Sequence, residues 1–179
     1  MIRYIKGDIT KSDCDIICHQ VNCQGVMNSG VAKAIREKWP EVYNKYRYNY
    51  EYAIENKHPM LGNVSLCRVN DKQIVINMFS QENYGYDGAR YTSYDAFMSC
   101  LHLVKNILKT TDTIAFPYKI GCVRGGANWK IIRAMIEEVF QDRKIYYYYL
   151  NEKDLDDDEQ LLIIATEMLK GATGVTINE

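Results

Sequence analysis

The sequence lacks the features that define several classes of protein. It has no run of 18 apolar residues, so no membrane-spanning helix is expected. Its 22 basic and 23 acidic residues nearly cancel, so the overall charge gives no indication of non-specific binding to a polyanion. Residues 1–6 are not followed by the apolar stretch of a signal peptide and are typical of a strand. These absences predict a cytoplasmic protein.

The cysteines do not form a recognisable metal or redox motif. The chain has six of them, and no two show the Cys-x-x-Cys spacing. Cys18, His19 and Cys23 lie close together but match no standard zinc spacing. We therefore expect reduced thiols, with neither a metal nor a cofactor.

The pattern of apolar residues predicts one α/β domain. A chain of 179 residues is ordinarily a single domain and buries roughly 70% of its unfolded surface. Short apolar runs alternate with stretches that repeat every three to four residues. The runs at 65–69 and 74–79 flank a turn-like break and predict a hairpin. The alternation predicts a three-layer α/β/α sandwich with a mixed central sheet, covering residues 1–150.

Residues 151–179 are expected to form a C-terminal helical extension packed on the same domain. Acidic residues at 156–159 stand where a helix N-terminus favours negative charge. Leu161, Ile164, Ala165 and Met168 then give the helix an apolar side. We expect this side to pack on the domain.

Two glycine-containing loops are the strongest candidates for a binding site. They span residues 22–32 and 120–129, and each lies between an expected strand and an expected helix. In open α/β sheets ligands bind at the carboxyl ends of strands, where exposed amides attract phosphate. Neither loop matches the P-loop or the Gly-x-Gly-x-x-Gly fingerprint. Two such loops nevertheless suit a diphosphate held between them.

The order and spacing of four motifs resemble those of a macrodomain, the ADP-ribose-binding fold. The motifs are Lys6-Gly7-Asp8-Ile9-Thr10, Asn22, the segment 29–35, and Phe116-Pro117 leading into Ile120-Gly121-Cys122. His19 before Asn22, the loop that ends at Trp129, and residues 77–81 followed by a tyrosine- and glycine-rich loop are similar to one particular branch. That branch contains ADP-ribose-1''-phosphate phosphatases and terminal ADP-ribose protein glycohydrolases.

The resemblance implies roles for individual residues. Asp8 would accept a hydrogen bond from the adenine amino group, Ile9 would lend a backbone amide, and Asn22 would lie beside the distal ribose. From the residues alone, a turn residue is the favoured interpretation of Asp8, and packing is favoured over a wall of the site for Tyr84, Tyr86 and Tyr118. The further binding residues that the resemblance implies are Ser29, Gly30, Val31, Ala32, Tyr84, Pro117, Gly121, Cys122, Val123, Arg124, Gly125 and Gly126.

The resemblance also implies a hydrolytic activity, with one departure from the pattern. The glycohydrolase branch uses a lysine and an aspartate where this chain has Gln81-Glu82 and Arg124-Gly125. The phosphatase-like branch places a histidine at the position of His19, which can move a proton near neutral pH. Asp87 and Glu82 are the candidate carboxylates. A buried histidine satisfied by the backbone is the alternative for His19.

The expected activity is removal of a 1''-phosphate or of an ADP-ribosyl group at the distal ribose. The alternative is a non-catalytic reader of ADP-ribose, or a sponge for a related nucleotide signal. The expected partner is ADP-ribose or an ADP-ribosylated protein or nucleic acid, bound by a monomer that does not contact membranes.

Overall fold

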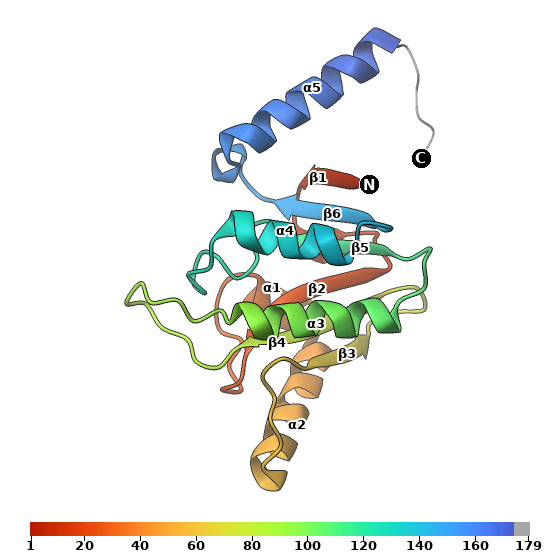
Figure 1. The fold of residues 1–179 in the computed structure, drawn as a ribbon. Helices are drawn as coiled ribbons and strands as arrows, with labels where there is room; N and C mark the ends of the chain where they lie inside the picture. The colour runs from red at the N-terminus through yellow and green to blue at the C-terminus, as the bar shows by residue number, and fades with distance from the viewer. Residues whose placement is uncertain (174–179) are drawn as a thin grey trace.

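A computed structural model describes the backbone of residues 1–173 and the side chains of residues 1–168. Six strands form one sheet in the order β1-β6-β5-β2-β4-β3 (Figure 1). β3 is antiparallel to β4, and every other neighbouring pair is parallel. The sheet is therefore mixed, and the predicted hairpin is confirmed. The strands are β1 (Ile2–Lys6), β2 (Ile16–Asn22), β3 (Val64–Arg68), β4 (Ile74–Gln81), β5 (Thr113–Pro117) and β6 (Lys144–Tyr149).

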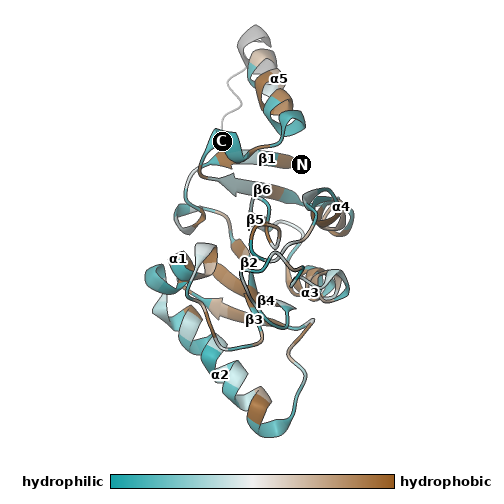
Figure 2. Cartoon of the chain, turned by 90° about the vertical axis from the view of Figure 1, so that its left-hand side faces the viewer, coloured by the Kyte–Doolittle hydropathy of each residue, from teal (hydrophilic) through white to brown (hydrophobic). Residues whose placement is uncertain are grey.

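Helices cover both faces of this sheet, as Figure 2 shows with the sheet seen from its side. Ile16 and Cys18 on β2 pack in the core beneath α3 (Tyr94–Ile107) and α4 (Trp129–Val139). Ile17, between them, packs on the opposite face in the core of α1 (Gly30–Lys38) and α2 (Pro40–Asn56). Successive strand residues point to opposite faces, so one strand contributes to both cores. The predicted three-layer α/β/α sandwich is confirmed.

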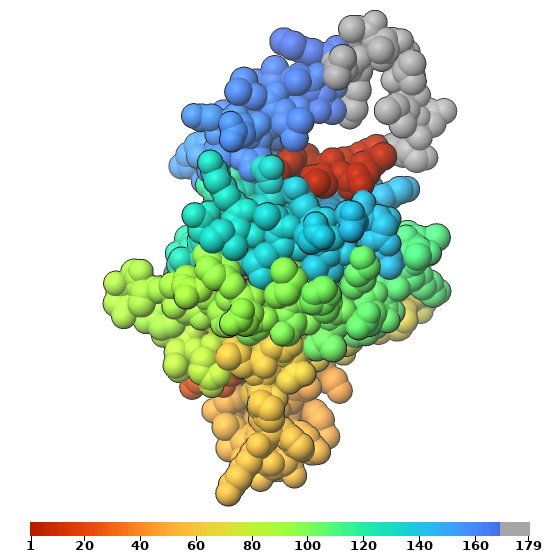
Figure 3. Space-filling model, viewed as in Figure 1, coloured from red at the N-terminus to blue at the C-terminus, as the bar shows by residue number. Residues whose placement is uncertain are grey.

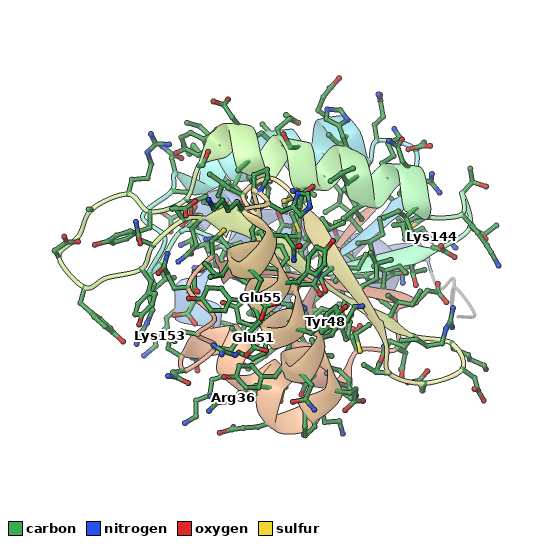
Figure 4. The ribbon with its side chains drawn as sticks, turned by 90° about the horizontal axis from the view of Figure 1, so that it is seen from below. Arg36, Tyr48, Glu51, Glu55, Lys144 and Lys153 are labelled. Atoms are coloured by element: carbon green, nitrogen blue, oxygen red, sulfur yellow. The ribbon has the colours of Figure 1, made fainter. Side chains whose placement is uncertain are left out.

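The helix α2 projects from the body of the molecule. It begins at Pro40, whose fixed backbone angle suits the first turn of a helix. Its tyrosine-rich stripe is divided, because Tyr46 is fully buried whereas Tyr48 is 62% exposed. Tyr48, Glu51 and Glu55 are labelled on this helix in Figure 4. Only one side of α2 therefore packs against the rest of the domain.

The parallel strands bring the predicted site together. β1, β6, β5, β2 and β4 run in the same direction, so their carboxyl ends meet at one edge of the sheet. The 3₁₀ turn η1 (Ile9–Lys11) follows β1 at this edge. Both predicted glycine loops also leave the sheet here, one after β2 and one after β5. This edge is where an open α/β sheet offers a ligand site.

The helix α5 (Asp157–Thr173), preceded by the 3₁₀ turn η2 (Glu152–Asp154), lies beyond β1 at one end of the molecule (Figures 1 and 3). Leu155 and Glu159 are buried, but Leu161, Ile164 and Met168 are 65%, 48% and 70% exposed. The expectation that this apolar side packs on the domain is therefore wrong for these residues. The helix contacts the domain through its first turn and then leads away from it.

The expected extension reaches residue 179, and positions 174–179 lie outside the described residues. Within the described part of the chain, no helix is both long and apolar enough to cross a membrane.

Candidate functional site

A cleft opens at the carboxyl ends of β2, β4 and β5. Its volume is about 560 Å³, and three segments of the chain line it. Residues 19–22 and 26–32 form one wall, residues 81 and 84–86 form part of the rim, and residues 117–125 form the opposite wall. The two predicted glycine loops therefore face one cavity.

Asn22 holds the first loop in shape. Its Oδ1 accepts hydrogen bonds from the Gln24 amide at 2.9 Å and from the Tyr46 hydroxyl at 2.7 Å. Its Nδ2 donates to the Val26 carbonyl at 2.8 Å. The Tyr46 hydroxyl also accepts from the Val26 amide at 2.8 Å. The loop is thus fastened to α2 by a fully buried tyrosine that the sequence patterns did not single out.

The first loop ends in the free amides of α1. Ser29 is the N-cap residue, but its hydroxyl makes no capping hydrogen bond. The amides of Gly30, Val31 and Ala32 belong to the first turn of the helix, where intrahelical acceptors are lacking. All four residues line the cleft. A helix N-terminus left open in this way favours an anionic group.

The second loop lies close against the end of the sheet. Gly121 has a φ of +73°, and a Cβ there would lie 2.7 Å from the Gln20 Oε1. A Cβ on Gly125 would collide with the Gly121 carbonyl and the Thr92 hydroxyl. Glycine is therefore required at both positions, by backbone conformation at the first and by close approach at the second.

A hydrogen-bond network holds this second loop in place. The Thr92 hydroxyl accepts from the Gln20 Nε2 at 2.9 Å and donates to the Gly121 carbonyl at 2.8 Å. The amides of Tyr91 and Thr92 both donate to the Gly125 carbonyl at 2.9 Å. Thr92 is 1% exposed, and it joins β2, the loop after β4 and the second loop. Neither Gln20 nor Thr92 belongs to a motif, so sequence reasoning missed both.

The charged side chains of the cleft are cationic. Among the described residues, no aspartate or glutamate lines the cavity, whereas Lys119 and Arg124 do. Arg124 donates to the Tyr86 hydroxyl at 2.6 Å, and its guanidinium lies 4.6 Å from the centre of the Tyr86 ring. This pair joins the second loop to the rim after β4. The cleft therefore combines free amides with positive charge and suits an anion.

Comparison with known proteins identifies this architecture. No family model matches the sequence. A structure from Bacteroides thetaiotaomicron is 29% identical, with a TM-score of 0.72 over 83% of this chain and 97% of that one. A macrodomain protein from Streptomyces coelicolor is 21% identical, with a TM-score of 0.70 over 84% of this chain and 100% of that one. The chain therefore has the fold of a macrodomain.

Further relatives carry names that describe an activity. An ADP-ribose 1''-phosphate phosphatase of Scheffersomyces stipitis is 38% identical over 68 residues, which are 35% of this chain and 39% of the relative. A DNA ADP-ribosyl glycohydrolase of Mycobacterium tuberculosis is 25% identical over 144 residues, which are 79% of this chain and 39% of the relative. Each match thus spans about two-fifths of the length of the named relative. Thermosipho africanus DarTG in complex with ADP-ribose is 19% identical, with a TM-score of 0.69 over 89% of this chain and 44% of that one.

His19 is buried at the base of the macrodomain cleft. It lines the cavity but is only 1% exposed. Its Nε2 lies 2.6 Å from the Asn77 Oδ1, and its Nδ1 has no hydrogen-bond partner in the described part of the chain. Burial lowers the pKa of His19 from 6.5 to about 4, and the contact with Asn77 only partly offsets this effect. The imidazole is therefore neutral at pH 7 and is paired with a side chain rather than with the backbone.

The structure does not bring the two candidate carboxylates to His19. Asp87 and Glu82 are exposed, and neither lines the cleft. Asp87 accepts from the Ala89 amide at 3.0 Å and the Tyr91 hydroxyl at 2.9 Å, which lower the pKa of its carboxyl. The backbone carbonyl of Glu82 accepts from the Cys23 amide at 3.2 Å. Their catalytic roles stay predictions without support from the geometry of the cleft.

Three predicted binding residues lie outside the lining of the cleft. Asp8 caps η1, with its Oδ1 accepting from the Thr10 amide at 2.9 Å, and Ile9 is buried. Gly126 donates its amide to the Cys122 carbonyl at 3.0 Å and closes the second loop. The predicted residues that do line the cleft are Asn22, Ser29, Gly30, Val31, Ala32, Tyr84, Pro117, Gly121, Cys122, Val123, Arg124 and Gly125.

Cys122 lines the cleft with a thiol that stays protonated near neutral pH. Its thiol lies 3.3 Å from the Ile120 carbonyl, and burial raises its pKa to about 12. A thiol with so high a pKa carries almost no thiolate near neutral pH.

Proposed function

We propose that this macrodomain binds ADP-ribose, free or attached to another molecule, with the diphosphate held between α1 and the second loop. The observation that carries the proposal is the composition of the cleft. The free amides of Gly30, Val31 and Ala32 line one wall, and Arg124 lines the other. Fixed amides and a guanidinium are strong partners for phosphate oxygens.

The strand order gives the ligand a direction. β1 and β6 lie on one side of β5, and β2 and β4 lie on the other. Asp8 follows β1, whereas His19 and Asn22 belong to β2. An elongated ligand that crosses the carboxyl edge would place its purine toward Asp8 and its distal ribose toward His19. Asp8 has one carboxylate oxygen outside the capping bond, and it is assigned to the adenine amino group.

The proposed reaction is hydrolysis at the distal ribose. Water attacks either the 1''-phosphate or the 1''-carbon; the ester or glycosidic bond breaks, and the leaving group takes a proton. The neutral His19 has a buried Nδ1 without a partner among the described residues, and the proposal assigns to it a hydrogen bond from the water or from a ribose hydroxyl. The loop amides hold the developing negative charge, a role worth roughly 3–4 kcal/mol for a single donor.

The named relatives favour a hydrolase over a reader. One is a phosphatase of ADP-ribose 1''-phosphate and another a glycohydrolase of ADP-ribosylated DNA. The DarTG structure shows that protein with ADP-ribose. Whether this chain acts on the phosphate, on an ADP-ribosylated protein or on a nucleic acid belongs to the proposal. The monomeric state and the cytoplasmic location also stay predictions.

Calorimetry with ADP-ribose tests the binding site. We expect Gly121→Ala to weaken binding at least tenfold, because the new Cβ meets Gln20 and Thr92. Gly88→Ala is the matched control, since Gly88 also has a positive φ but no atom of the described residues lies within 4 Å of a Cβ there. Loss of affinity in both variants alike, or no binding by the unaltered chain, would contradict the assignment.

Product release tests the activity. The substrates are ADP-ribose-1''-phosphate, a mono-ADP-ribosylated protein and ADP-ribosylated DNA. We expect release from at least one of them, and loss of release in His19→Ala with nearly unchanged affinity for ADP-ribose. Tight binding without release from any substrate would identify a reader instead.

A further inference from the structure

The segment after β6 reaches the wall of the cleft. The Lys119 Nζ lies 2.7 Å from the Asp156 Oδ1 and donates to the Asp154 carbonyl at 2.9 Å. The Asp156 amide donates to the Tyr118 hydroxyl at 2.9 Å. Tyr118 and Lys119 both line the cleft. Two consecutive wall residues are thus held by their side chains from a segment that lies outside the cavity.

The first turn of α5 anchors this segment. Glu159 is 2% exposed, and its Oε1 accepts from the Trp129 Nε1 at 3.1 Å and from the Arg133 Nη1 at 2.8 Å. The Trp129 ring in turn meets the Tyr118 ring edge-on, with 5.0 Å between the centres. Glu159 is the buried member of this ion pair, whereas the Arg133 side chain is 38% exposed, and a buried carboxylate left without its cation is costly. The contacts of Glu159 therefore determine the position of this turn.

The backbone of the wall depends on these contacts. Lys119 has a φ of +55°, in the left-handed region that residues other than glycine seldom occupy. Such a conformation persists where surrounding contacts determine it. The Lys119 ammonium contacts Asp154 and Asp156, and it also lies 5.3 Å from the centre of the neighbouring Tyr118 ring.

The same segment also contacts the end of β1. The Lys6 Nζ lies 2.8 Å from the Glu152 Oε1, and the Gly7 amide donates to the Tyr149 carbonyl at 2.8 Å. Asp8 follows directly in the chain. Residues 149–159 therefore connect the turn that carries Asp8 with the wall formed by Tyr118 and Lys119.

We infer that Asp156 and Glu159 are positioning residues of the cleft, which hold the Tyr118–Lys119 wall at the purine end of the ligand. This inference rests on the proposed function for the identity of the ligand. The extension then supports the binding site, although none of its described residues lines the cleft.

Point variants of the full chain test the inference. Asp156→Asn removes the charge beside Lys119 and leaves the backbone contacts in place. Glu159→Gln keeps a side-chain acceptor for Trp129 but removes the charge opposite Arg133. Asp158→Asn is the matched control, since Asp158 is exposed in the same turn and outside these contacts. Each variant is measured for its dissociation constant with ADP-ribose and for hydrogen–deuterium exchange of residues 117–123 without ligand.

We expect Asp156→Asn and Glu159→Gln to raise the dissociation constant three- to tenfold and to speed exchange in residues 117–123, with Asp158→Asn unchanged in both. Unaltered exchange in both test variants, or equal effects of Asp158→Asn, would overturn the inference. Faster exchange with unaltered or tighter binding would overturn it as well. If the unaltered chain does not bind ADP-ribose, the proposed function fails, and the exchange measurement still decides whether the extension holds the wall.

Discussion

The Nε2 atom of His19 lies 2.6 Å from the Oδ1 atom of Asn77, and the two side chains are 1% and 0% exposed. With the Asn77 oxygen as acceptor, the proton of the neutral imidazole is on Nε2. The buried Nδ1, which has no hydrogen-bond partner among the described residues, is then an acceptor. Asn77 thus sets the tautomer of His19.

The low pKa of His19 predicts a loss of stability in mild acid. The imidazole has a pKa of about 4 in the folded chain and 6.5 as its ordinary value, so the unfolded chain binds the proton more readily. The contribution of neutral His19 to the free energy of unfolding is present in full above pH 6.5. It is lost as the pH falls toward 4, at about 1.4 kcal/mol per pH unit. Urea denaturation between pH 7 and pH 4.5 measures it. His19→Gln should flatten the profile in this range, and an unaltered slope would contradict the assignment.

Tyr46→Phe should loosen the first loop. The variant keeps the ring but removes the hydroxyl that bonds Asn22 and Val26. Buried polar groups left unpaired cost roughly 1–3 kcal/mol, so we expect a fall in the free energy of unfolding of that size and weaker binding of ADP-ribose. Tyr43→Phe is the control, because the Tyr43 ring contacts Arg36 and Tyr46 and its hydroxyl has no part in the loop. Equal effects of the two variants would count against the role of Tyr46.

Asp8→Asn isolates the charge assigned to adenine recognition. Asparagine can still cap η1 through its side-chain oxygen, so the fold should change little. Loss of a hydrogen bond to a charged group should weaken binding by about 1.5–3 kcal/mol, measured by calorimetry with ADP-ribose. Asp13→Asn, at an exposed carboxylate nearby, is the control. Unchanged affinity in Asp8→Asn would remove Asp8 from the binding site.

Arg124→Ala should weaken binding and reduce its dependence on salt. The guanidinium is held over the Tyr86 ring and lines the cleft, where it faces the proposed diphosphate. We expect a fall of roughly tenfold in affinity at low salt and a smaller difference at high salt, because ions screen exposed charges. Arg68→Ala, at the end of β3, controls for net charge. The same salt dependence in Arg124→Ala and in the unaltered chain would exclude a contact with phosphate.

The alternation of apolar runs and helical stripes predicted the strands, the helices and the hairpin, because each signal lies within one short segment. The glycine loops were also predictable, since Gly121 and Gly125 mark backbone conformations that other residues resist. The apolar side of α5 shows the limit of this reasoning. Leu161, Ile164 and Met168 have helical spacing, but the direction of the helix is set by Glu159 and its partners on α4.

The contacts that shape the cleft were likewise not predictable from local sequence patterns. Tyr46 is 24 residues from Asn22, Thr92 is 72 residues from Gln20, and Asp156 is 38 residues from Tyr118. No local pattern encodes such pairs, because each depends on how the strands are ordered in the sheet. The separation of Asp87 and Glu82 from His19 was decided in the same way, by the path of the loop after β4. The sequence by itself determined local backbone conformation and the periodicity of the helices and strands. The partners of the buried polar groups were decided only by the tertiary structure, because they come from segments that are distant in the chain.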